Sequence, residues 1–403
     1  MLQVAENRYT VKRFSVSKFS FSYIKVLLLL LLLLGTFFSK LNIAGPFYLY
    51  DLLLIIPLPF IISKYSYNKK DLPIILALLV AFAYLFVYVF ISKAGLDIVL
   101  RQFMLFGYLL IAYLYLAIAR NNENFYASAE DFLILFGRLS FLIQSIYIVI
   151  VIIFITRNIN GAGNYFYYSP VIILGIIVYS IYQLVYSKYK LAWIIFGTIL
   201  LTTTGHSSAF LSLFIAIFLF YINKLPRPIR VLGFISLIII SFVMLSGKSS
   251  FSDNNAQWRF FYWYFTLKNI FIGHFGLLGN GFGVPYADDS TAYFLEVIKE
   301  FTTHLSDETE SYLSPMHNSF LTIAFHIGFI FSLLIIHPIL KVLTAFCTQV
   351  TIKNKEYIFI ALSLIGVSIW AANNVILELP HSSLFFWLIY FLFFFKFYNT
   401  KVA

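Results

Sequence analysis

The stretch SPMHNSFLTIAFHIGFIF, residues 314–331, has the apolar run of a membrane-spanning helix but begins with polar residues. His317, Asn318 and Ser319 stand in a row, and His326 lies deeper in the apolar run. Asn and Ser are favoured helix N-caps, so one interpretation is a plain helix start at a bilayer surface. A histidine at the same place also fits a reactive site, because its charge changes near physiological pH.

The rest of the chain has the same apolar character. Of its 403 residues, 61% are hydrophobic and only 11% are charged, whereas an ordinary soluble domain has about 25% charged residues. Apolar stretches of roughly 17 to 25 residues recur, which is the length a helix needs to cross about 30 Å of hydrocarbon. The composition predicts an all-α polytopic membrane protein. Cys347 is the only cysteine, which excludes an internal disulfide.

The apolar runs predict about twelve transmembrane helices. The first contains VLLLLLLLLG, residues 26–35, which we interpret as a retained helix rather than a cleaved signal peptide. The predicted spans are 24–38, 45–62, 72–91, 96–119, 131–156, 168–186, 191–204, 206–222, 229–246, 317–345, 356–376 and 382–398. The chain is thereby divided into spans 1–9 within residues 1–246, a large outer loop at 247–316, and spans 10–12 within residues 317–403.

The distribution of Lys and Arg predicts the orientation. With the N-terminus inside, the cytoplasmic segments hold about seventeen basic residues and the outer segments about seven. We therefore expect both termini to be cytoplasmic and the acidic 247–316 loop to be outside. The net charge of +11 reflects these short basic loops and does not predict nucleic-acid binding. Within the large loop, residues 256–279 predict a helix lying in the membrane interface, and residues 287–310 could hold another short helix.

Nearly all the costly polar residues within or beside the predicted spans gather in one layer at the outer edge, and the exceptions, Arg138 and Lys341, can extend to the inner surface. Ionisable groups in a bilayer are costly and are therefore functional candidates. The layer consists of Asp51, Asp97, Arg101, His206, His317, Asn318 and Glu378. The alternative for Asp51 is a satisfied core acid, and for Asp97 with Arg101 an ordinary i,i+4 pair. His326 lies about 13 Å deeper than His317 on the opposite helix face and is predicted to be a core histidine.

Three motifs follow one another on the predicted outer side. They are TTTGHSSAFLSLF at 202–214, QWRFFYW at 257–263 with LGNGFG at 278–283, and MHNSFLTIAFHIG at 316–328. In this order and topology the chain resembles the O-antigen polymerase and O-antigen ligase superfamily of bacterial membrane glycosyltransferases. The resemblance is specific over residues 200–320. It implies a metal-independent enzyme of the bacterial inner membrane, without a cofactor, that acts on polyprenyl-diphosphate-linked oligosaccharides.

The resemblance also implies roles for individual residues. His317 matches the essential histidine, as a general base or acceptor-positioning group, and Arg259 matches the loop arginine that binds diphosphate. His206 stands where the superfamily usually has arginine, so His206, Arg101 or Arg157 would supply the second phosphate contact. These roles suit the chemistry, because a neutral imidazole can take a proton from a sugar hydroxyl and a guanidinium can stabilise a leaving diphosphate.

The remaining substrate-binding candidates are Asn318, Trp263 and Gly281. Trp263 lies one helical turn from Arg259 and could stack on a sugar, although an interfacial aromatic belt with a snorkelling arginine gives the same pattern. Gly281 belongs to GNGFG, which follows no strand and predicts a tight turn near substrate rather than a nucleotide loop. Asp288 and Asp289 raise the alternative of a metal site, but adjacent loop acids are usually solvated.

The function expected from the resemblance is polymerisation of lipid-linked repeats into O-antigen, capsule or exopolysaccharide. The close alternative is the ligase, which transfers the glycan to lipid A–core. A lipid-linked oligosaccharide flippase is the alternative from another class, although transporters place polar groups near the midplane and often show repeats. Expected partners are the polyprenyl-linked substrate, membrane lipid, a chain-length regulator and a flippase.

The orientation can be tested with single cysteines in a Cys347→Ala background. Ser290→Cys lies in the predicted outer loop and should react with a membrane-impermeant thiol reagent in intact spheroplasts. Ser187→Cys, in a predicted cytoplasmic loop, should react only after lysis. The reverse pattern would overturn the predicted topology.

Overall fold

The computed structural model describes residues 15–44, 47–156, 170–204, 206–246, 254–272, 277–287, 310–348 and 351–398. This part of the chain is helical apart from turns, loops and one small antiparallel pair of strands, β1 (Asn42–Ala44) and β2 (Phe47–Tyr48). The helices are α1 (Val16–Lys40), α2 (Leu49–Ile55), α3 (Leu58–Ile62), η1 (Lys69–Asp71), α4 (Leu72–Ile91), α5 (Leu96–Ala119), α6 (Phe125–Thr156), α7 (Pro170–Tyr186), α8 (Lys190–Thr202), α9 (Ser207–Ile222), α10 (Arg227–Ser246), α11 (Asn254–Ile272), α13 (Glu310–Leu313), α14 (Ser319–Thr348), α15 (Lys355–Ala371) and α16 (Pro380–Phe397).

Each predicted span other than 45–62 lies largely within one helix, and α4 and α5 have the predicted bounds. The segment predicted as one span at 45–62 is different, because it contains a strand and two short helices, α2 and α3. Pro57 lies between these helices and has no backbone N–H to continue the hydrogen-bond ladder. The interfacial helix predicted at 256–279 is confirmed as helix as far as Ile272, where α11 ends, whereas residues 277–279 are not helical. Residues 288–309, most of the second helix predicted in the large loop, lie outside the described residues.

Six of the described helical segments are long and apolar enough to cross a membrane: Val16–Leu34, Lys69–Ile91, Leu96–Ala119, Phe125–Ile153, Ser319–Thr348 and Pro380–Phe397. Further apolar segments are shorter, among them Pro170–Tyr186 and Lys190–Thr202. The fold is therefore that of an all-α membrane protein.

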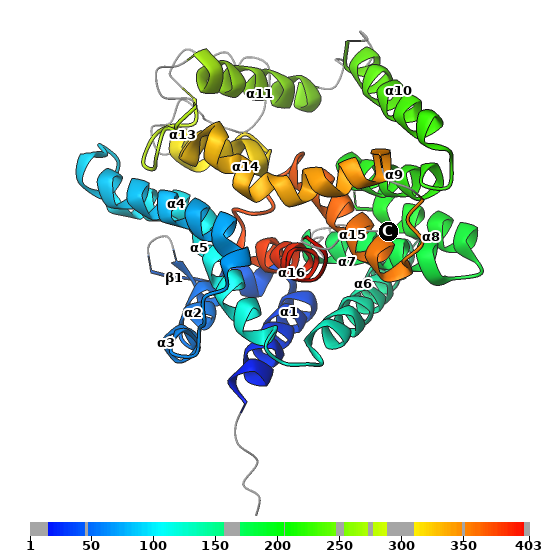
Figure 1. The fold of residues 1–403 in the computed structure, drawn as a ribbon, viewed down its shortest axis with the longest axis horizontal. Coiled ribbons are helices and arrows are strands. Elements are labelled where there is room, and N and C mark those ends of the chain that lie inside the picture. The colour runs from blue at the N-terminus through cyan, green and yellow to red at the C-terminus, as the bar shows by residue number, and fades with distance from the viewer. Residues whose placement is uncertain are drawn as a thin grey trace, which may run out of the picture.

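The helices form a bundle with α16 near its centre and α1, α5, α7 and α15 around it (Figure 1). Most of α5 and α16 is buried, whereas α4 exposes large apolar side chains such as Phe86 and Phe90, and α6 exposes Leu142 and Val149. Such exposure is unfavourable in water but suits contact with lipid tails. Helix α11 packs across α14 at one edge of the bundle (Figure 1).

Helix α14 is interrupted at Gly328, which has a positive φ of 84°. The 277–283 segment passes against this break, where the Asn280 N–H donates to the Phe325 carbonyl at 2.8 Å and the Gly281 N–H to that of His326 at 3.0 Å. The backbones are so close that a Cβ on Gly279 would lie 2.4 Å from the Gly328 nitrogen. The segment thus satisfies carbonyls that the broken helix leaves free, as non-helical backbone inside a membrane protein requires.

The His326 side chain also holds the 277–283 segment in place. Its ring is fully buried, with Nδ1 2.6 Å from the Gly281 carbonyl oxygen and Nε2 3.0 Å from the Tyr286 hydroxyl. The ring stacks on Phe282 at 4.9 Å. Both ring nitrogens are hydrogen-bonded, which confirms the prediction of a core histidine.

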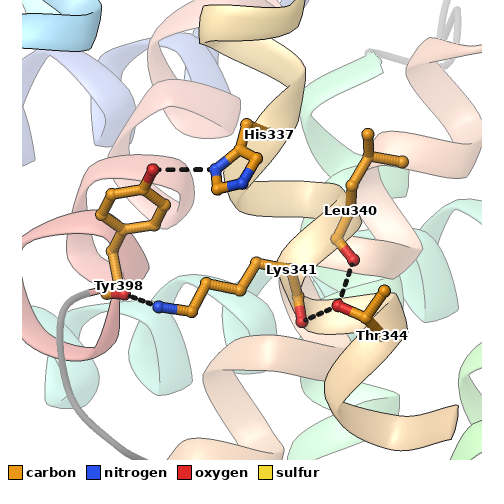
Figure 2. Close-up of a pocket in the computed structure, with 5 residues that line it drawn as sticks. All are labelled: His337, Leu340, Lys341, Thr344 and Tyr398. Carbon is orange, nitrogen blue, oxygen red and sulfur yellow. Dashed lines mark hydrogen bonds between the residues drawn. The ribbon is translucent and has the colours of Figure 1, made fainter. Parts of the chain in front are cut away.

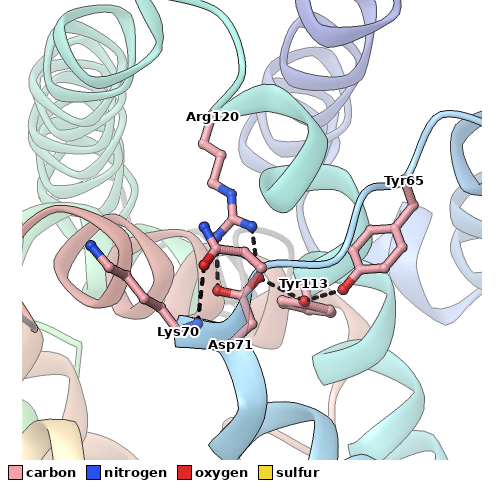
Figure 3. Close-up of polar contacts among 6 residues, drawn as sticks. Tyr65, Lys70, Asp71, Tyr113 and Arg120 are labelled. Atoms are coloured by element: carbon pink, nitrogen blue, oxygen red, sulfur yellow. Dashed lines mark hydrogen bonds and ion pairs between the residues drawn. The ribbon is translucent and has the colours of Figure 1, made fainter.

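The end of the bundle where α5 and α16 finish is held by polar contacts between helices. His337 Nδ1 lies 2.8 Å from the Tyr398 hydroxyl, and Lys341 donates to the Tyr398 carbonyl (Figure 2). Nearby, both oxygens of the buried Asp71 carboxylate accept hydrogen bonds from Arg120, at 2.8 and 2.7 Å (Figure 3). Tyr113 donates to the same carboxylate at 2.9 Å. These contacts join α14 to the end of α16, and the residue before α4 to the end of α5.

The Asp71–Arg120 pair gives a prediction about stability. Asp71→Leu leaves the Arg120 guanidinium without its partner and should lower the free energy of unfolding by about 3–5 kcal/mol. The measurement is thermal unfolding of the purified protein in detergent. The double variant Asp71→Leu, Arg120→Met should recover much of the loss, because no charge is left unpaired. An Asp71→Leu variant that melts like the unmodified protein would contradict this role.

Candidate functional site

The loop at residues 372–379 joins α15 to α16 and contacts the start of α14. The Ser319 hydroxyl accepts hydrogen bonds from the N–H groups of Ile376 and Leu377, at 3.0 and 3.1 Å. The single hydroxyl proton is shared between two acceptors, the Asn374 carbonyl and the Glu378 carboxylate. Four contacts on one small side chain therefore fix the loop against the helix start. We call this part of the molecule, with α11, the His317 end.

The segment that carries His317 is held by α11. Tyr262 donates its hydroxyl to the Ser314 carbonyl at 2.8 Å, and Trp263 donates Nε1–H to the Met316 carbonyl at 2.7 Å. The ring of Trp258 meets the His317 ring edge to face, with centroids 5.3 Å apart. The aromatic residues of α11 thus position the backbone on both sides of residue 315.

His317 itself has an unusual backbone conformation. Its φ is 52°, and no other non-glycine residue in the described part of the chain has a positive φ. Its N–H donates to the Pro315 carbonyl at 2.8 Å. A left-handed conformation costs free energy in a residue with a side chain, and strained residues of this kind are enriched at functional sites.

Asn318 caps α14, as its sequence position predicts. Its side-chain oxygen accepts from the N–H groups of Phe320 at 3.2 Å and Leu321 at 3.1 Å. The helix start therefore has a cap of its own, and His317 is not needed for that purpose. A substrate contact by Asn318 remains a prediction.

Arg259 and His206 lie together beside the 372–379 loop. Arg259 donates Nη1–H to the Asn373 carbonyl at 3.0 Å, and Asn374 donates to the Ser208 hydroxyl at 2.8 Å. Burial, with the positive charge of Arg259, lowers the pKa of His206. His206 is therefore neutral near pH 7, and it can donate a hydrogen bond to a phosphate without adding a charge. Arg157, the third candidate for this contact, lies outside the described residues.

Arg101 lies on α5 at a cavity of about 140 Å³. The cavity is lined by Arg101, Gln102, Leu105, Tyr286, Tyr312, Leu313, Pro315, Val375, Glu378 and Leu379. The Arg101 guanidinium lies 4.9 Å from the Tyr48 ring centroid and acts electrostatically on Asp51. Arg101 does not form the alternative ion pair with Asp97, four residues before it. Asp97 is exposed, and no ion pair joins the two in the described structure.

Asp51 itself is a satisfied core acid in the structure. Its carboxylate is fully buried and accepts from the Tyr48 N–H at 2.9 Å and the Tyr108 hydroxyl at 2.8 Å.

Glu378 is a member of the predicted polar layer for which no role was predicted from the sequence. Its carboxylate lines the cavity and accepts from the Ser319 hydroxyl. Burial raises the pKa of the Glu378 carboxyl, and hydrogen bonds from Ser319 and Thr322 act in the opposite direction. In the sequence, the feature that marks Glu378 is an acidic residue at the end of an apolar run, directly before Leu379 and Pro380. Its proximity to Arg101 depends on chain packing and is not visible in the sequence.

Gly281 lies away from this cavity. It is buried with a φ of 75°, and a Cβ there would lie 2.0 Å from the Tyr88 ring. Its peptide groups bind His326, so its visible contacts are those of a packing residue. Trp263 likewise uses its indole N–H to hold Met316. Substrate binding by Gly281 and Trp263 remains a prediction.

No group of three or more His, Cys, Asp and Glu side chains that could hold a metal ion is found among the described residues. Asp288 and Asp289 lie outside them.

Comparison of the chain with protein-family models and with curated proteins gives no match, and comparison of its structure with solved structures gives none.

The packing role of Gly281 can be tested by adding one methyl group. Gly281→Ala should reduce the yield of folded protein, because the new Cβ meets Tyr88 and the positive φ is strained by about 1–3 kcal/mol. Gly107→Ala is the control, since its Cβ would meet only Met104 at 3.5 Å. Size-exclusion chromatography and thermal unfolding measure both variants. A Gly281→Ala protein as stable as the Gly107→Ala protein would contradict the packing role.

Proposed function

We propose that this chain is a membrane glycosyltransferase that polymerises polyprenyl-diphosphate-linked oligosaccharide repeats. The observation that carries the proposal is the meeting of Arg259, His206 and the His317 segment around the 372–379 loop. These residues come from three separate motifs, at residues 202–214, 257–263 and 316–328. Their convergence supports the resemblance from which the function was expected.

In the proposed reaction, a hydroxyl oxygen of the acceptor sugar attacks the anomeric carbon of the donor glycan. The bond from this carbon to the lipid diphosphate breaks, and the diphosphate takes the electron pair. His317 removes the hydroxyl proton as general base. Arg259 stabilises the charge on the leaving diphosphate, and neutral His206 donates a hydrogen bond to it.

The proposal includes the twelve-span topology, with both termini cytoplasmic and the His317 end at the outer face of a bacterial inner membrane. Lipid-linked repeats would reach this face through a flippase, and a chain-length regulator would act on the growing polymer. The basic residues concentrated in the predicted cytoplasmic loops support this orientation.

His317 is tested by gene replacement. His317→Ala should reduce polymerisation by about two to four orders of magnitude, because a general base is lost. The readout is the glycan ladder on gels, together with lipid extracts. Single repeats reaching the surface would identify a polymerase, whereas full-length glycan retained on polyprenyl diphosphate would identify a ligase. His337→Ala, at the other end of α14, is the matched control and should leave the ladder unchanged. A normal ladder with His317→Ala at equal protein level would reject the catalytic role.

Arg259 is tested by a change that keeps its charge. Arg259→Lys should still impair polymerisation strongly, because a lysine cannot make the bidentate contact that a guanidinium makes with phosphate. Lys268→Arg, at an exposed position on the same helix, should have no effect. Full activity of Arg259→Lys would assign Arg259 to anchoring in the membrane interface.

A further inference from the structure

Two buried polar atoms beside the 372–379 loop, one on Arg101 and one on Glu378, belong to residues that line the same cavity. In the described structure, neither Arg101 Nη1 nor Glu378 Oε1 has a hydrogen-bond partner. The cavity has a volume of about 140 Å³. A buried polar atom without a hydrogen-bond partner is costly, so these two atoms need an explanation. A ligand that both donates and accepts hydrogen bonds would satisfy both atoms.

Hydrogen bonds hold the residues that line the cavity in place. Gln102 donates Nε2–H to the carbonyls of Val284 and Tyr312, at 3.0 and 2.9 Å, and accepts from the Gly283 N–H at 2.7 Å. This buried side chain therefore ties two segments of the large loop to α5. The Tyr286 N–H also donates to the Ser311 carbonyl at 2.9 Å. The polar and aromatic lining is held in place before any ligand binds.

The cavity also adjoins the His317 segment on both sides. Pro315, two residues before His317, lines it, and Ser319, two residues after, is bonded to Glu378. A volume of about 140 Å³ is about ten times the space that one water molecule needs. The cavity thus has room for a ring-sized polar ligand beside the segment that carries the proposed base.

We infer that this cavity is the acceptor subsite and binds one neutral sugar ring. In this arrangement, sugar hydroxyls donate to Glu378 and accept from Arg101, and the faces of Tyr286 and Tyr312 cover the ring. A diphosphate fits poorly here, because the Glu378 carboxylate repels it. Glu378 is then a positioning residue that aims the acceptor hydroxyl at His317. This inference rests on the proposed function, to which it adds the acceptor site.

Binding can be measured without relying on activity. In a Cys347→Ala background, Leu313→Cys places a thiol on the cavity wall, at a position that is 41% exposed. Its rate of reaction with a small maleimide is measured on the purified protein, with glucose, galactose, rhamnose, N-acetylglucosamine or glycine present in millimolar amounts. At least one sugar should slow the reaction. Glycine, a small zwitterion, should not. Leu340→Cys, on the cavity at the other end of α14, is the control that no sugar should protect.

The contacts are tested by adding Glu378→Gln or Arg101→Gln to the Leu313→Cys protein. Each should weaken protection by a sugar about tenfold to hundredfold, as expected when a hydrogen bond to a charged group is lost. In the polymerisation assay, Glu378→Gln should raise KM for the acceptor more than it lowers kcat. Thermal unfolding shows whether each variant is folded.

The outcomes separate this inference from the proposed function. Protection by sugars in a protein that polymerises nothing would reject the polymerase and retain the sugar site. A polymerising protein whose Leu313→Cys reacts equally with and without every sugar would reject the subsite. Protection by glycine alone would also reject it, since the cavity would then bind a zwitterion.

Discussion

The Ser319 hydroxyl is the contact on which the His317 end depends. It accepts from two backbone N–H groups of the 372–379 loop and shares its single proton between Asn374 and Glu378. The loop in turn accepts from Arg259 and donates to Ser208. One serine therefore connects the beginning of α14 with α9, α11 and the cavity. A buried polar network of this kind is stable only when nearly all of its members are satisfied.

The charged groups at this end are divided between two places. Arg259 and neutral His206 lie on one side of the loop, where an anion would be stabilised. Arg101 and Glu378 face the cavity, where a neutral polar ligand would be stabilised. His317 lies on the segment whose Pro315 lines this cavity and whose Ser319 is bonded to Glu378. A glycosyl transfer from a lipid diphosphate to a sugar hydroxyl needs such a division, because its leaving group is an anion and its nucleophile is neutral.

Much of the helical framework follows from apolar run lengths, and α4 and α5 match their predicted ranges. The break at Pro57 and the crossing of Gly279 and Gly328 were not predicted, because each depends on how distant backbones pack. The sequence placed His317, Asn318, Arg101, His206 and Glu378 in one polar layer, and the cap by Asn318 was foreseen. It could not show that Arg101 and Glu378 line the same cavity, because apolar periodicity says nothing about which polar side chains come together across a bundle.

The central claim is that the His317 end of this chain transfers glycan from a lipid diphosphate. The direct measurement uses the purified protein in lipid nanodiscs with isolated polyprenyl-diphosphate-linked repeats as the sole substrate. Products are separated by length, and released polyprenyl diphosphate is quantified. The account predicts a ladder of longer glycans with one polyprenyl diphosphate released for each linkage formed, and neither product with His317→Ala. Unchanged substrate in the presence of folded, unmodified protein would contradict it.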